Sequence, residues 1–201
     1  MKTLEVTITY IDELLGTASA DPEIHSRFIA SKAPDAARLA EEVAAIGAEA
    51  VEERAMTVFP RLEDGTPFTY DYQWRGFFKE SCGMLRRADG TKSKGLKAYK
   101  KEVDGLVFVS PRRIPLVLPE GEGVGHCQRP LRAQTLQGER VALANSETVP
   151  AGTTQTFQVH LLRDDLEPMV REWLAYGRLH GTGQWRNSGK GRFTHEVRIV
   201  A

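Results

Sequence analysis

The residues best suited to binding chemistry lie in one glycine-rich stretch near the end of the chain, residues 181–191. Glycine allows backbone conformations that turn several N–H groups toward one anion, and neighbouring cations add charge. Hydrogen-bonding side chains and an indole ring stand in the same stretch. We predict a loop that holds a phosphate, and its candidate contacts are Gly181, Gly183, Trp185, Arg186, Asn187, Ser188, Gly189 and Lys190.

The surrounding elements exclude two familiar nucleotide-binding motifs. A dinucleotide-binding glycine fingerprint joins a strand to a following helix, whereas this stretch follows a predicted helix and precedes a predicted strand. A P-loop requires a GKS or GKT sequence, and the chain has neither. A tight connection in which the glycines serve only as turn residues stays open as the simpler alternative.

A second candidate surface is the basic segment 86–104, which we expect to form a loop. The whole chain has no net charge, with 27 basic and 27 acidic side chains, so only local segregation of charge can attract a polyanion. Segment 35–54 is acidic, whereas segment 86–101 has a single acid, Asp89. The cations of this basic ribbon are Arg86, Arg87, Lys92, Lys94, Lys97, Lys100 and Lys101.

Aromatic rings beside cations are the other requirement for binding single-stranded nucleic acid. Trp185 lies in a polar stretch and is the better candidate for a stacking surface. Trp74 shares the apolar face of a predicted helix, which favours a core position, but Arg75 next to it is a candidate contact. Scattered arginines usually mean a solvated surface, and those of this chain are Arg112, Arg113, Arg129, Arg132 and Arg140.

Hydrolytic chemistry has little support in the sequence. The five histidines show no HExxH spacing, and no GxSxG nucleophile elbow accompanies them. His25 and His180 remain as a candidate acid or base, so a metal-independent RNA endonuclease stays an alternative. Cys82 and Cys127 lack CxxC spacing, so we expect neither a zinc site nor a disulfide framework.

Hydrophobic periodicity predicts the elements that position these residues. Apolar residues alternate in a first strand at 4–9, and a helical stripe from Trp74 to Leu85 follows a turn at 63–67. The remaining predicted elements are a strand at 106–109, an edge-like extension at 114–118, a hairpin of 129–135 and 140–146, a strand at 156–162, a helix around 166–174 capped by Asp164 or Asp165, and a last strand at 193–200.

One inserted segment departs from this pattern. Residues 16–60 contain an alanine- and glutamate-rich run that predicts a largely helical arm. When this arm and the hairpin are set aside, the order is strand, helix, strand, strand, helix, strand. We therefore predict a single α+β domain over residues 1–201 with a ferredoxin-like, or RRM-like, βαββαβ core.

Three segments together resemble the RAMP superfamily of CRISPR-associated RNA-binding proteins. The glycine-rich stretch between a helix and the last strand is similar to the loop near the end of these proteins. Residues 67–76, PFTYDYQWRG, look like the family's proline, short polar run and basic-glycine pair that opens the first helix. Residues 146–154, SETVPAGTT, resemble the stretch before its third core strand. The segments occur in the family's order.

The resemblance implies a ferredoxin-like protein that binds crRNA, with the glycine loop and Arg75 near the RNA and with copies assembled side by side. It does not imply cleavage, because the aspartate that backbone-type nucleases of the family carry ahead of the first helix is missing from residues 53–60. We therefore predict a non-catalytic module for crRNA-like single-stranded RNA or a CRISPR ribonucleoprotein. The alternatives are an endonuclease of the crRNA-processing type and a nucleotide-scavenging or protein-interaction module.

An overall likeness to short proteins carried in prophages adds a finer hypothesis. The protein would then be a stand-alone, phage-encoded member that acts, as an anti-CRISPR protein does, on a nucleic-acid-based defence of the host. The chain opens without a basic region and apolar run, and no stretch approaches about 18 apolar residues. We expect a cytoplasmic location, in the host if the protein is phage-encoded, with no membrane partner and no cofactor.

Overall fold

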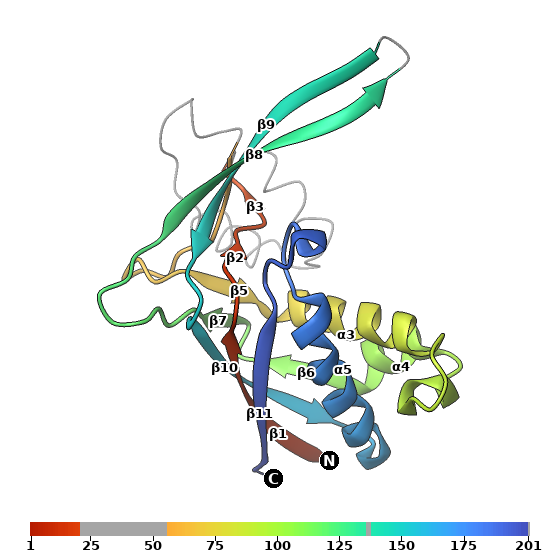
Figure 1. Cartoon of the computed structure of the whole chain (residues 1–201). Coiled ribbons are helices and arrows are strands. Elements are labelled where there is room, and N and C mark those ends of the chain that lie inside the picture. Colours follow the sequence, from red (N-terminus) through yellow and green to blue (C-terminus); the bar gives the residue numbers. More distant parts are fainter. Residues whose placement is uncertain (21–55, 136–137, 201) are drawn as a thin grey trace, which may run out of the picture.

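The computed structural model describes residues 1–20, 56–135 and 138–200 of the chain (Figure 1). A four-stranded antiparallel sheet forms the centre of the fold. Across this sheet the strands are β11 (Phe193–Ile199), β1 (Lys2–Tyr10), β10 (Thr154–Leu161) and β6 (Val107–Ser110). Its helical cover consists of α3 (Asp71–Leu85) and α5 (Glu167–His180), which lie against one face.

The chain follows a βαββαβ path through β1, α3, β6, β10, α5 and β11. The last strand lies beside the first, and the second core strand, β6, lies at the far edge. This arrangement confirms the predicted α+β class and the ferredoxin-like core. The structure also confirms the core strands predicted at 4–9, 106–109, 156–162 and 193–200.

Alternation along β1 explains how the sheet builds its core. Leu4, Val6 and Ile8 are fully buried on the helical face, because successive side chains of a strand point to opposite faces. Trp74 of α3 packs on Phe157, with ring centroids 4.6 Å apart, and is only 3% exposed. The core position predicted for Trp74 is therefore confirmed.

A second sheet of five strands contains the long hairpin. The predicted hairpin is confirmed and is longer than expected, and its two strands extend away from the core in Figure 1. The strands of this sheet are β8 (Gly125–Thr135), β9 (Gly138–Val149), β2 (Leu14–Leu15), β4 (Met56–Val58) and β3 (Ala18–Ser19).

The extension predicted at 114–118 is a short strand, β7 (Arg113–Pro115). It pairs antiparallel with β5 (Phe68–Tyr70), the strand that leads directly into α3. Ile114 is the buried residue of β7, and Phe68 and Tyr70 of β5 are buried as well. The pair forms a separate two-stranded sheet.

Two predicted segments differ from the structure. The arm predicted at 16–60 is extended at its described ends, because β3 and β4 pair with each other there, and its remainder, with His25, lies outside the described residues. Segment 86–104 is not a loop throughout. A 3-10 turn, η2 (Lys92–Gly95), is followed by a helix, α4 (Tyr99–Leu106), which buries Val103 completely. The charged residues of this segment therefore lie on a folded element.

The predicted cap of α5 is wrong. The 3-10 turn η3 (Asp164–Leu166) precedes the helix, and neither aspartate caps it. Asp165 instead accepts a hydrogen bond from Arg163. Pro168 lies in the first turn of α5 and has no N–H group. This turn therefore has one N–H donor fewer that needs a capping side chain.

Gly177 sets how closely α5 approaches the sheet, because a Cβ atom there would lie 2.1 Å from the ring of Phe193. Gly177→Ala should therefore destabilise the protein by about 1–3 kcal/mol through overpacking, measured as the free energy of unfolding in urea. Gly76→Ala in α3 is the matched control, since a Cβ atom at that position meets nothing within 4 Å. It should stabilise the fold by about 0.5–1 kcal/mol. Equal effects of the two changes would contradict this packing.

Candidate nucleic-acid interface

The glycine loop, residues 181–192, joins α5 to β11 and folds back on itself. The amide of Thr182 donates to the carbonyl oxygen of Gly191 at 2.9 Å, and the amide of Gly191 donates to that of Glu13 at 2.8 Å. A Cβ atom on Gly191 would lie 2.0 Å from the carbonyl oxygen of Thr182, and Gly181 and Gly191 both have positive φ. These two glycines are therefore required to close the loop.

Gln184 fastens the glycine loop to the second sheet. Its Nε2 donates to the carbonyl oxygen of Gly16 at 2.8 Å and to Oγ1 of Thr57 at 3.0 Å. Its Oε1 accepts a hydrogen bond from Nη2 of Arg129 at 2.8 Å. Neither Gln184 nor Arg129 was predicted as part of the site, because nothing in the local sequence indicates contacts between residues so far apart.

Two cations at the end of the loop are paired with carboxylates of the segment that follows β1. Nζ of Lys190 lies 2.6 Å from Glu13. Nε of Arg192 lies 2.7 Å from Asp12. The predicted phosphate contact Lys190 therefore already has an acidic partner, and an anion would compete with Glu13 for its charge.

Arg186 connects the loop to α3 through a charged cluster. Its Nη1 contacts the carboxylate of Glu80 and lies 2.9 Å from Nε2 of His180, which itself lies 3.0 Å from Glu80. Partial burial opposes the ionisation of Glu80, but the hydrogen bonds from Arg186 and His180 outweigh it and hold the pKa of this carboxyl below its ordinary value of 4.5. His180, a predicted acid-base candidate, is thus engaged with both charged neighbours.

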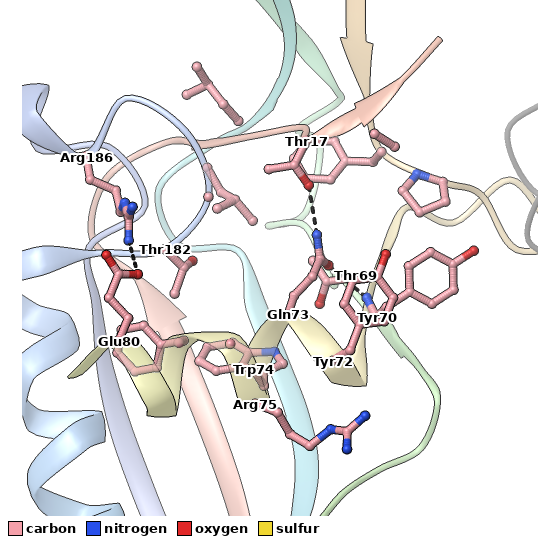
Figure 2. A pocket seen from close by; sticks show the side chains of 18 of the residues that line it. Thr17, Thr69, Tyr70, Tyr72, Gln73, Trp74, Arg75, Glu80, Thr182 and Arg186 are labelled. Carbon is pink, nitrogen blue, oxygen red and sulfur yellow. Dashed lines mark hydrogen bonds and ion pairs between the residues drawn. The ribbon is translucent and has the colours of Figure 1, made fainter. Parts of the chain in front are cut away.

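A pocket of about 710 Å³ lies between α3 and the glycine loop (Figure 2). Small-ligand sites usually enclose about 300–1,000 Å³. Figure 2 shows Gln73 hydrogen-bonded to Thr17 toward one end and Arg186 paired with Glu80 toward the other. The pocket therefore brings the first-helix motif and the loop together, and its lining includes Thr17, Phe59, Tyr72, Gln73, Arg75, Gly76, Thr182, Gly183 and Arg186.

Arg75 lines this pocket and has no ion-pair partner among the residues that the structure describes. Figure 2 shows its guanidinium on the side of α3 that faces away from Thr17 and Arg186, and its Nε is buried without a hydrogen-bond partner. Gly76 next to it is exposed and borders open space. Both residues of the basic-glycine pair noted in the sequence therefore line the pocket, and Gly76 leaves room there for a ligand.

Trp185 keeps an exposed ring in the middle of the glycine loop. It is 41% exposed and has left-handed backbone angles, with φ 56° and ψ 36°. Asn187 and Ser188 follow in the 3-10 turn η4 (Arg186–Ser188) and are also exposed. These predicted contacts are therefore accessible at the surface of the loop.

The basic ribbon is not part of the pocket, since none of its cations lines it. Arg86 is half-buried, and its guanidinium lies 5.1 Å from the centroid of the Tyr99 ring. Lys94 contacts Asp89. The exposed cations of the ribbon are Arg87, Lys92, Lys94, Lys97, Lys100 and Lys101. The structure thus joins Arg75 to the glycine loop but places the ribbon on η2, α4 and the segments around them.

The face of the central sheet that the helices leave uncovered is polar. Threonines pair across it, with Oγ1 of Thr7 lying 3.1 Å from Oγ1 of Thr156. Among the aromatic residues on the described strands of this sheet, Phe108 is exposed, whereas Tyr10, Phe157 and Phe193 are buried. RRM-type recognition stacks two or three bases on aromatic rings of this face. The loop and its pocket are therefore the better candidate interface.

Metal sites and membrane spans find no support in the described part of the chain. In residues 1–20, 56–135 and 138–200, no group of three or more His, Cys, Asp or Glu side chains could hold a metal ion. None of the helices described is long and apolar enough to cross a membrane. Cys82 and Cys127 are free thiols, and burial raises the pKa of Cys82.

The core and its strand order define a ferredoxin-like α+β protein. A chain in the cryo-EM structure of type III-B Cmr-beta bound to cognate target RNA is similar, with a TM-score of 0.57 and 11% sequence identity over 99% of this chain and 60% of that one. A chain in a type IV-B CRISPR complex has a TM-score of 0.49 and 13% identity over 99% of this chain and 91% of that one. No family model and no curated protein matches the sequence.

The similarity to the Cmr-beta chain shows a shared fold, and it agrees with the fold that the RAMP resemblance implied. This chain spans 60% of the length of that chain. The residues of the glycine loop and the pocket must therefore carry any argument about ligands.

Glu80→Gln removes the carboxylate that joins α3 to the loop. Because the pKa of Glu80 in the folded protein lies below its ordinary value of 4.5, its charge stabilises the fold above that pH, and the contribution is lost as the pH falls through the lowered pKa. The variant should therefore unfold more easily in urea than wild type at about pH 7, with a smaller difference at about pH 3.

The matched control for this change is Glu63→Gln, at an exposed position away from the loop. It should alter the free energy of unfolding little at either pH. A Glu80→Gln effect that does not depend on pH would contradict the role assigned to the ion pair.

Proposed function

We propose that this protein is a non-catalytic module that binds single-stranded RNA of the crRNA kind, alone or within a CRISPR ribonucleoprotein. The observation that carries this proposal is the pocket that joins the first helix to the glycine loop. It combines aromatic walls, hydrogen-bonding side chains and a cation without a counter-ion. These are the groups that bind the bases and the backbone of a single strand.

Arg75 is the electrostatic centre of the proposed site. The chain has no net charge, so attraction for a polyanion must be local. Two neighbouring cations are compensated, because Lys79 pairs with Asp104 and because Arg186 contacts Glu80. We therefore expect few phosphates to be neutralised, each adding about −0.7 to the slope of log affinity against log salt.

The fold similarity supports RNA as the class of ligand, since the Cmr-beta structure is bound to its cognate target RNA. Arg75 and the glycine loop are, in addition, the segments for which the RAMP resemblance implies RNA contact. The finer hypotheses stay predictions: that the protein is phage-encoded, that copies assemble into a homo-oligomer, and that it acts on a host defence system.

Gly76→Trp should block the proposed site. The position is exposed on α3 and lines the pocket, and a Cβ atom there meets nothing within 4 Å, so the variant should fold. Its affinity for a labelled single-stranded RNA, measured by fluorescence anisotropy, should fall about tenfold or more, because the new indole occupies the space for the ligand.

Gly123→Trp is the control for this change, because Gly123 is equally exposed and unobstructed but does not line the pocket. It should bind RNA as wild type does. If both variants bind equally well, the pocket is not the RNA site.

Arg75→Ala tests the phosphate contact itself. It should weaken RNA binding and reduce the magnitude of the salt slope by about 0.7, because one phosphate is no longer neutralised. Arg87→Ala removes an exposed arginine of the basic ribbon outside the pocket and should leave the slope unchanged. Titrations at several salt concentrations measure both. A larger effect of Arg87→Ala would assign the RNA to the ribbon instead.

A further inference from the structure

Arg129 is a buried cation without an acidic partner in the described part of the chain. The side chain is 6% exposed, and it is held by Oε1 of Gln184 at 2.8 Å and by Oγ of Ser146 at 3.4 Å. Its Nε is buried with no hydrogen-bond partner. Burying a charge is unfavourable unless a partner compensates it, so a further neighbour of Arg129 must stabilise its charge.

The neighbour that explains its position is the ring of Trp185. The guanidinium carbon of Arg129 lies 5.2 Å from the centroid of this ring, within the distance of a cation-π contact. Gln184, next to Trp185 in the loop, holds the same guanidinium from the side. The hydrogen bond from Arg129 to Gln184 therefore holds the guanidinium in place beside the indole.

The backbone of Trp185 provides an independent observation. Among the described residues, Trp185 is the residue other than glycine that has a positive φ, at 56°. Gly181, Gly183, Gly189 and Gly191 of the same loop also have positive φ, which glycine adopts without strain. A glycine would suit position 185 better for folding alone. Backbone strain of this kind concentrates at binding sites, and here it holds a large ring 41% exposed to solvent.

We propose that Trp185 stacks one nucleobase of a bound single strand and favours a purine, with Arg129 as the positioning residue behind it. The inference rests on the proposed RNA-binding function and specifies one contact of that site. The larger ring system of a purine overlaps an indole more fully than a pyrimidine does. The positive charge of Arg129 withdraws electron density from the indole and attracts the phosphates that flank the stacked base.

The loop places this contact beside the pocket. Gly183 and Arg186 line the pocket, and Trp185 lies between them in the chain. A strand that enters the pocket over Arg75 and Gly76 can therefore place a neighbouring base on the indole. Arg129 does not touch the base, because it lies buried against the ring.

Tryptophan fluorescence tests the proposal directly on the full-length protein. Trp185 is the exposed tryptophan, whereas Trp74 and Trp173 are 3% and 0% exposed, so stacking should quench mainly Trp185. Titration with a short oligo(A) RNA should quench the emission strongly, and oligo(U) of equal length should quench it less and bind more weakly. Trp185→Gly, which also relieves the backbone strain, should lose about tenfold in affinity for oligo(A).

Arg129 requires a readout that a purely structural role would not change. Arg129→Met keeps the length of the side chain without its charge, and it should lower both the quenching and the preference for oligo(A) over oligo(U). Arg129→Lys keeps a cation near the ring and should restore part of that preference. An unchanged preference in Arg129→Met would remove this residue from the site.

The outcomes separate this inference from the proposed function. If oligo(A) binds without quenching and Trp185→Gly binds as wild type does, the stacking contact is refuted while RNA binding stands. If Trp185→Gly abolishes binding to another protein and leaves RNA binding unchanged, the ring serves a protein partner and the inference fails. Absence of binding to any single-stranded RNA overturns the proposed function and this contact with it.

Discussion

The fold depends on the point at which the two ends of the glycine loop cross. Gly191 lies so close to Thr182 that no side chain fits between their backbones. This crossing ends α5 and starts β11 opposite Tyr10 of the first strand. It also presents Gln184 to the second sheet. The crossing thus lies where the helical layer, the central sheet and the sheet of the hairpin come together, and the pocket lies beside it.

The distribution of charge around this crossing favours selective binding over general attraction to polyanions. Lys190 and Arg186 each have a carboxylate partner, so a phosphate must displace an acid before it can use their charge. Arg75 and Arg129 lack such a partner in the described chain, and one is buried behind a ring. An anion gains most where its shape fits both the pocket and the indole, which disfavours ligands that match charge alone.

Local patterns in the sequence predicted the core, because burial on one face of a strand or helix leaves a period that can be read directly. The alternation at 4–9 and the stripe from Trp74 are of this kind. The contact between Arg129 and Gln184 joins residues 55 positions apart, and no local pattern encodes it. In the basic segment, the many lysines led to the prediction of a loop. Leu96 and Val103 are nevertheless buried in the core and hold this segment against it.

The pairing of β3 with β4 has a consequence for the length of the segment between them. Ala18 lies opposite Val58 and Ser19 opposite Thr57, so the two described ends of segment 21–55 lie on adjacent strands of the second sheet. The entropy of closing a loop grows only slowly with its length. A change in the length of segment 21–55 can therefore leave the register of β3 and β4 unchanged. Since Ala18 and Thr57 also line the pocket, such a change would alter the surroundings of the pocket while the core stays the same.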